Sequence, residues 1–129
     1  MLSELKEFFK ADTFANLLGI EIIDAKDGFC TCKMQRKDDL LNATGVIQGG
    51  ALYTLGDFCF AVASASTGKK AVTSMLTMTY LRPAVGNEII AKATPVHLGK
   101  RIYNYEVSLF DGDKIVARLA VQGCVIDEK

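Results

Sequence analysis

The residues best suited to chemistry lie in one apolar, alanine-rich stretch that runs from Gly49 to Ser66. Asp57 is the one acidic or basic residue in it, and a carboxylate can serve as a general base or as a nucleophile. Gly49 and Gly50 open the stretch, where a helix presents unpaired N–H groups and the positive end of its dipole. Because neither glycine has a Cβ, a ligand can approach those N–H groups closely, as in an oxyanion hole.

Each of these residues also has a purely structural interpretation. Asp57 can be a buried carboxylate satisfied by local hydrogen bonds, and the glycine pair can serve close helix packing. Asn42 can form an Asx turn in the preceding loop, and Gln48 can simply lead into the helix. Taken one at a time, the residues leave both interpretations open.

The stretch itself is predicted to be a long central helix. It contains no proline, and its length suits about four to five helical turns. Apolar side chains cover most of its circumference, which predicts a helix buried by the rest of the chain. A membrane span is disfavoured because Asp57 lies in the middle and small or hydroxylated residues are frequent.

The flanking segments alternate in the manner of strands. Two strands, 20–24 and 29–36, precede the helix and are joined by the hairpin signal Asp27-Gly28. Four longer strands follow it, separated by short turns that predict an antiparallel meander, with Pro95 marking an edge or a bulge. These four are 71–81, 88–98, 101–110 and 114–126. The order predicts an α+β hotdog fold, in which a curved antiparallel sheet of five to six strands wraps around a long central helix.

Length and composition limit the number of domains and the class of protein. With 129 residues, half of them apolar, the chain is predicted to be a single domain spanning 1–129. A net charge of zero argues against a nucleic-acid surface. The start of the chain lacks a secretory signal pattern, so we expect a cytoplasmic protein. The four cysteines show no CxxC spacing and His97 is distant, which predicts buried reduced thiols and no metal site.

Two motifs stand out in this chain. The first is Asn42-x-x-Gly45-x-x-Gln48-Gly49-Gly50-x-x-x-x-Leu55-x-Asp57, and the second is Tyr80-Leu81-Arg82-Pro83-Ala84. Together they resemble the hotdog acyl-CoA thioesterases of the phenylacetate-pathway, or PaaI-like, type. The resemblance extends from about Asn16 to Ile126. One departure stands out, because the family usually has histidine at the position of Gln48. Glutamine still donates and accepts hydrogen bonds, but it cannot titrate.

The resemblance implies hydrolysis of an acyl-CoA thioester. Asp57 would be the base or nucleophile, and the Gly49 N–H would polarise the carbonyl. Asn42 would orient the carbonyl or the water, and Gln48 stands where the family's histidine supports the loop or helps place the substrate carbonyl. Thr73 matches a position that holds the water or the carboxylate. Three basic residues match positions that often bind the nucleotide end of coenzyme A, namely Arg82, Lys100 and Arg101. This chemistry needs neither a metal nor an organic cofactor.

Geometry adds a requirement if Gly49 and Asp57 act on one carbonyl. They are eight residues apart (57 − 49), or about 12 Å along a helix, which one side chain cannot bridge. Two antiparallel copies related by a two-fold axis bring Gly49 of one copy against Asp57 of the other. We therefore expect a homodimer, and the family commonly pairs dimers into tetramers. The expected partner is acyl-CoA, with no nucleic acid and no membrane; the alternative is a hotdog protein that binds an acyl ligand without hydrolysing it.

Overall fold

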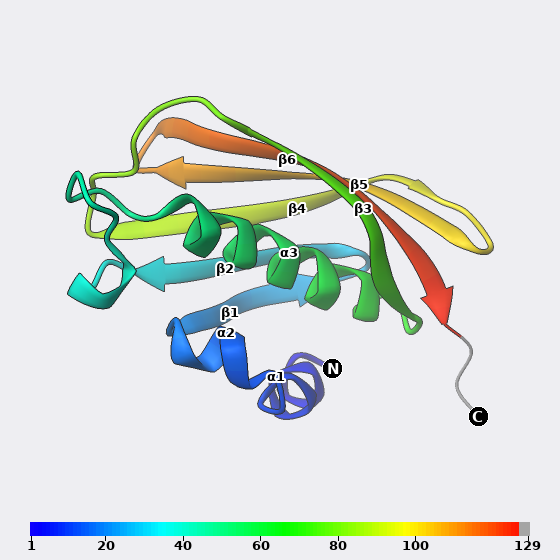
Figure 1. Cartoon of the computed structure of the whole chain (residues 1–129). Coiled ribbons are helices and arrows are strands. Elements are labelled where there is room, and N and C mark those ends of the chain that lie inside the picture. The colour runs from blue at the N-terminus through cyan, green and yellow to red at the C-terminus, as the bar shows by residue number, and fades with distance from the viewer. Residues whose placement is uncertain (127–129) are drawn as a thin grey trace.

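One antiparallel sheet curves around a long helix in the computed structural model, which describes residues 1–126 (Figure 1). Its elements, in chain order, are α1 (Leu2–Phe9), α2 (Thr13–Leu17), β1 (Ile20–Lys26), β2 (Phe29–Gln35), a 3₁₀ turn (Asp38–Leu40), α3 (Gly49–Ala65), β3 (Lys70–Tyr80), β4 (Glu88–Leu98), β5 (Ile102–Asp111) and β6 (Lys114–Ile126). The predicted α+β hotdog architecture is confirmed, with six strands in the sheet.

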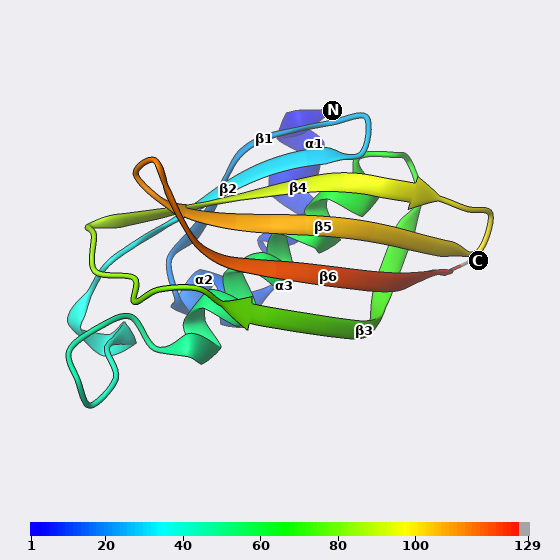
Figure 2. The same ribbon diagram turned by 90° about the horizontal axis from the view of Figure 1, so that it is seen from above.

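The predicted meander of the last four strands is wrong in one respect. The sheet order is β1-β2-β4-β5-β6-β3, so β3 pairs with β6 and forms an edge, as Figure 2 shows. The chain does not turn back into a hairpin after β3. Instead, the N–H groups of Leu81 and Arg82 donate to the Val116 carbonyl, at 2.8 and 3.4 Å. The segment then crosses to the far side of β5 before β4 begins.

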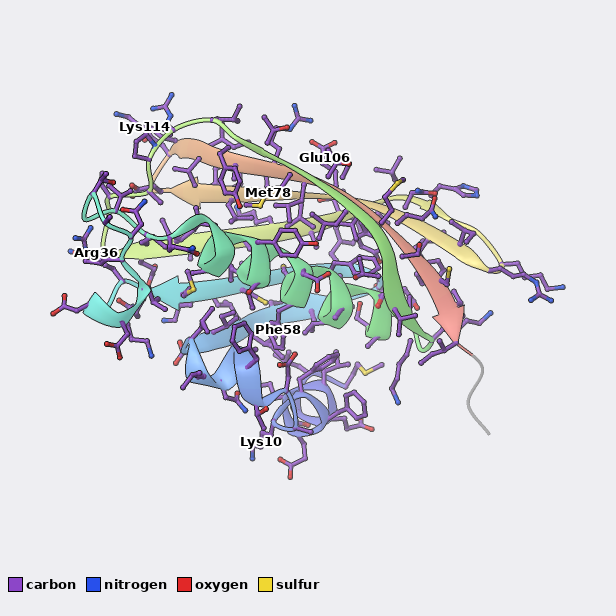
Figure 3. All side chains as sticks on the ribbon, in the orientation of Figure 1. Lys10, Arg36, Phe58, Met78, Glu106 and Lys114 are labelled. Atoms are coloured by element: carbon purple, nitrogen blue, oxygen red, sulfur yellow. The ribbon has the colours of Figure 1, made fainter. Side chains whose placement is uncertain are left out.

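Two glycines allow α3 to lie close against β6. A Cβ at Gly56 would come within 2.5 Å of a Leu119 methyl, and one at Gly123 within 2.5 Å of the Phe60 ring. On another side of the helix, Phe58 reaches toward the N-terminal helices (Figure 3) and meets the Phe9 ring edge to face at 5.5 Å. These contacts fix both the height and the rotation of α3 on the sheet.

The composition predicted a helix buried on all sides, but one side of α3 is only partly buried. Leu55, Cys59 and Phe60 are fully buried, but five residues on one side of the helix form a less buried stripe. We call this stripe the outward face; it comprises Gly50, Tyr53, Thr54, Asp57 and Ala61. It is open because β3, whose Thr73 contacts Asp57, ends the sheet at this point.

Several local predictions are confirmed. Asp27 and Gly28 adopt positive φ angles of 53° and 92° in the β1–β2 hairpin. The register of β4 shifts between Pro95 and His97, which is the predicted bulge. Within residues 1–126, no helix has the length and apolar character needed to cross a membrane.

Three of the cysteines meet in the core, a proximity that their sequence spacing did not indicate. Cys30 and Cys32 lie on one face of β2, and Cys59 reaches them from α3. Hydrogen bonds with Cys32 and then Cys59 lower the pKa of the Cys30 thiol. The bond to Cys30 raises the pKa of Cys32, and burial raises the pKa of Cys59. All three cysteines are free thiols with no disulfide among them.

Candidate active site

The N-terminus of α3 leaves one backbone donor unpaired. Gln48 is the N-cap, and its side-chain oxygen accepts from the Gly50 N–H at 2.5 Å. The N–H groups of Ala51 and Leu52 both donate to the Gln48 carbonyl, at 2.9 and 3.3 Å. Among the described residues, the Gly49 N–H has no acceptor. The Gly50 N–H is thus occupied by the Gln48 side chain in this structure, whereas the Gly49 N–H is available.

Side chains hold the Gly49–Gly50 peptide group at both ends. Gln48 accepts from its N–H, and the Tyr80 hydroxyl donates to its carbonyl oxygen at 2.8 Å. Burial, with a smaller effect of Tyr53, raises the pKa of Tyr80, so the phenol stays protonated and able to donate. Tyr80 belongs to a motif visible in the sequence, but its position against Gly49 depends on the route of β3 and was not predicted.

Asn42 organises the loop that leads into α3. Its side-chain oxygen accepts from the Thr44 N–H at 2.9 Å, the Thr44 hydroxyl at 2.8 Å and the Val46 N–H at 3.2 Å. This is the Asx-turn interpretation, and it commits the oxygen while the side-chain NH₂ group has no acceptor within residues 1–126. Asn42, Gly49, Tyr80 and Arg82 line one pocket of about 410 Å³.

Asp57 lies in the middle of the outward face and is held by β3. The Thr73 hydroxyl donates to one carboxylate oxygen of Asp57 at 2.7 Å. The adjacent Ser74 instead donates to the Gln122 carbonyl at 3.2 Å, because β3 has a bulge between Thr73 and Met75. The second carboxylate oxygen of Asp57 has no protein partner in the described part of the chain. The carboxylate is therefore oriented but still accessible.

The three basic residues do not gather in one place. Arg82 follows β3 and lies near the start of α3, whereas Lys100 and Arg101 occupy the β4–β5 turn near its end (Figure 1). Antiparallel strands put successive connections at opposite ends of a sheet, so one chain cannot bring these residues together. Lys100 and Arg101 share a pocket of about 370 Å³ with Lys69 and Lys70. Likewise, Gly49 and Asp57 stay on separate turns of α3.

Comparison with known proteins identifies the family. The thioesterase superfamily matches residues 44–117. The acyl-coenzyme A thioesterase PaaI of Escherichia coli K12 is 35% identical over 102 residues, which is 78% of this chain and 73% of that protein. Human acyl-coenzyme A thioesterase 13 is 31% identical over 123 residues, covering 92% of this chain and 86% of that protein.

A solved structure agrees with the sequence comparison. The structure of the E. coli PaaI protein from the phenylacetic acid degradation operon has a TM-score of 0.89 and 32% identity, covering 94% of this chain and 89% of that chain. The free N–H at the start of α3 and the oriented carboxylate on its outward face therefore occur in the fold that this family uses. The chain belongs to the thioesterase superfamily, in which it is a PaaI-like hotdog thioesterase.

Proposed function

We propose that this protein hydrolyses acyl-CoA thioesters at a site shared by two copies of the chain. The proposal rests on the presence of two groups on one helix. Among the described residues the Gly49 N–H has no acceptor, and Thr73 orients the Asp57 carboxylate. Two relatives reported above are named as acyl-coenzyme A thioesterases, which supports this substrate class.

The open edge of the sheet supports a shared site. β3 has one unpaired edge, and Val72 and Met75 on it are 52% and 60% exposed. A second copy pairing there in antiparallel fashion would cover this edge and the outward face of α3 together. The two α3 helices would then run antiparallel, so that Gly49 of one copy faces Asp57 of the other.

The proposed reaction divides the work between the two helices. The Gly49 N–H, at the positive end of the α3 dipole, stabilises the negative charge that develops on the thioester oxygen. Asp57 of the second copy either removes a proton from the attacking water or attacks the carbonyl itself. On the second route the thiolate of coenzyme A leaves, and water opens the resulting anhydride. Thr73 orients the carboxylate, and no metal or organic cofactor takes part.

The same arrangement explains the separated basic residues. In an antiparallel pair, the α3 start of one copy lies near the α3 end of the other. Arg82 of one copy and Lys100 and Arg101 of the other would then flank one cleft, where they can pair with the phosphates of coenzyme A. Asn42 lines the pocket beside Gly49, and its NH₂ group would orient the carbonyl or the water.

Thiol release from a panel of aromatic and aliphatic acyl-CoAs tests the reaction. Asp57→Asn keeps the shape of the side chain and removes its charge, so we expect kcat to fall by about 10³-fold. Asp113→Asn, in the exposed β5–β6 turn, is the matched control and should leave kcat unchanged. Saturable acyl-CoA binding without thiol release by the wild type would favour the non-catalytic alternative.

Mixed dimers test whether the site is shared. Asp57→Asn and Gly49→Pro chains, each inactive alone, are unfolded and refolded together. A shared site gives each mixed dimer one intact site, so about a quarter of the wild-type activity should return at equal mixing. A site contained in a single chain would leave the mixture inactive, which would disprove the two-copy proposal.

A further inference from the structure

The three clustered cysteines have no role in the proposed hydrolysis. Cys30 and Cys32 point from β2 to the same side, and their sulfur atoms are 3.5 Å apart. Cys59 approaches them from the inward side of α3, and all three sulfur atoms lie within 4.8 Å of one another. The side chains are 3%, 0% and 0% exposed, so the cluster is closed to bulk water.

We propose that Cys30, Cys32 and Cys59 form a three-coordinate sulfur site for a soft monovalent metal ion of the copper(I) class. The elements that carry the ligands are already packed against each other, so the site needs no rearrangement of the fold. Two ligands come from one strand and the third from the helix, which fixes a triangle of donors.

The size of the triangle suits such an ion. Three atoms within 4.8 Å of one another leave a central point no more than about 2.8 Å from each, compared with metal–sulfur bonds of about 2.3 Å. Movements of about 0.5 Å, within reach of small χ1 rotations, bring all three sulfur atoms to bonding distance. The required adjustment is thus smaller than a change of rotamer.

The donor set favours copper(I) over zinc. Zinc in structural sites takes four ligands in a tetrahedron, whereas all-sulfur sites select soft ions such as copper(I). No fourth histidine, cysteine or acidic side chain joins the three cysteines within residues 1–126. The nearest other polar atoms recorded around Cys59 are the carbonyl oxygens of Cys30 and Ala91, at 3.5 and 3.6 Å. These carbonyl oxygens are hard donors, and they belong to the backbones of β2 and β4.

Binding requires no redox step. Because cysteine binds a metal as the thiolate, three thiols form three copper–sulfur bonds and release their protons to solvent, with no change in oxidation state. The bound ion would tie β2 to α3 and stabilise the fold, while the outward face keeps its chemistry.

Metal uptake after refolding tests the site. The chain is refolded anaerobically with copper(I) supplied as its acetonitrile complex, desalted, and assayed for copper content and melting temperature. We expect one copper ion per chain and a melting temperature that rises with the copper concentration. Zinc(II) under the same conditions should be retained at less than a tenth of that level, and the rate of thiol release should not change.

Variants assign the uptake to the cluster. Cys59→Ala and Cys30→Ala should each abolish copper retention, whereas Cys124→Ala, at the half-buried cysteine of β6, should retain one ion. Cys32→Ser provides a second variant if an alanine variant fails to fold, as judged by thiol release without copper. Copper retained by all cluster variants, copper lost in Cys124→Ala, equal zinc uptake, no uptake by the wild type, or a disulfide found by mass in place of metal would each overturn the proposal.

Discussion

The two sides of α3 differ in their burial and in the side chains they carry. The outward face carries Asp57, oriented by Thr73 and open on its second oxygen. The inward face, which we define as Leu55, Gly56, Cys59 and Phe60, is fully buried and contains no carboxylate. Asp57 and Cys59 are only two residues apart, but two helical residues turn through about 200°, so they face opposite ways.

The difference shows how a charge and a close-packed core can share one helix. A carboxylate without a cationic partner would be costly on the inward face, because burial penalises its charge. On the outward face it keeps contact with solvent and with the open edge of the sheet. Gly56 lets the inward face approach β6 closely, and this packing positions the outward face for chemistry. Changes on the outward face should therefore alter the rate, and changes on the inward face should alter the stability.

After Asp57→Asn, the next largest effect is expected at the start of α3. Gly49→Pro removes the unpaired N–H, and the extended backbone of Gln48 already suits a residue before proline. We expect kcat to fall by about 10²-fold, the usual effect of losing one oxyanion donor. Gly49→Ala is the matched control, since it adds the same Cβ 3.0 Å from the Tyr80 hydroxyl but keeps the N–H. Equal losses in both variants would attribute the effect to crowding.

On the inward face, Gly56→Ala should lower stability. The new methyl would meet Leu119 at 2.5 Å, so we expect a loss of about 1–3 kcal/mol in the free energy of unfolding, despite the better helix propensity of alanine. Urea denaturation measures the loss, and kcat per folded chain should stay within about twofold of wild type. A lower kcat with unchanged stability would contradict the division between the two faces.

The support of Asp57 can be tested without touching the carboxylate. Thr73→Val keeps the shape and removes the donor, and we expect kcat to fall by about tenfold, in line with the strength of a hydrogen bond to a charged group. Thr73→Ser retains the hydroxyl and should recover most of the activity. If valine and serine behave alike in steady-state kinetics, the hydrogen bond does not position the carboxylate.

The smallest effect is expected at Tyr80. Tyr80→Phe removes the hydrogen bond to the Gly49 carbonyl, and one net hydrogen bond of about 1 kcal/mol corresponds to a fall of about fivefold in kcat, with KM little changed. Tyr53→Phe, on the outward face, is the control. Adding Tyr80→Phe to Gly49→Pro should have little further effect on kcat, because the N–H that it positions is already absent. Additive losses would show that Tyr80 acts independently.

Most of the local structure follows from the sequence. The strands after the helix were predicted to within one residue at each boundary, because alternation of side chains and turn residues are local signals. The Asp27-Gly28 hairpin and the bulge at Pro95 follow from the backbone preferences of single residues. The sequence also puts Gly49 and Asp57 on one helix, since no helix-breaking residue separates them.

The tertiary structure decided which distant residues meet. The pairing of β3 with β6, rather than β4, depends on the route of residues 81–87 and brings Tyr80 against Gly49 and Thr73 against Asp57. Packing of α3 on β2 joins Cys59 to the two cysteines of the strand. The same pairing leaves β3 unpaired on one side and so exposes the outward face. These are contacts between residues far apart in the chain, and their geometry is set by strand order and helix rotation, neither of which has a local signal.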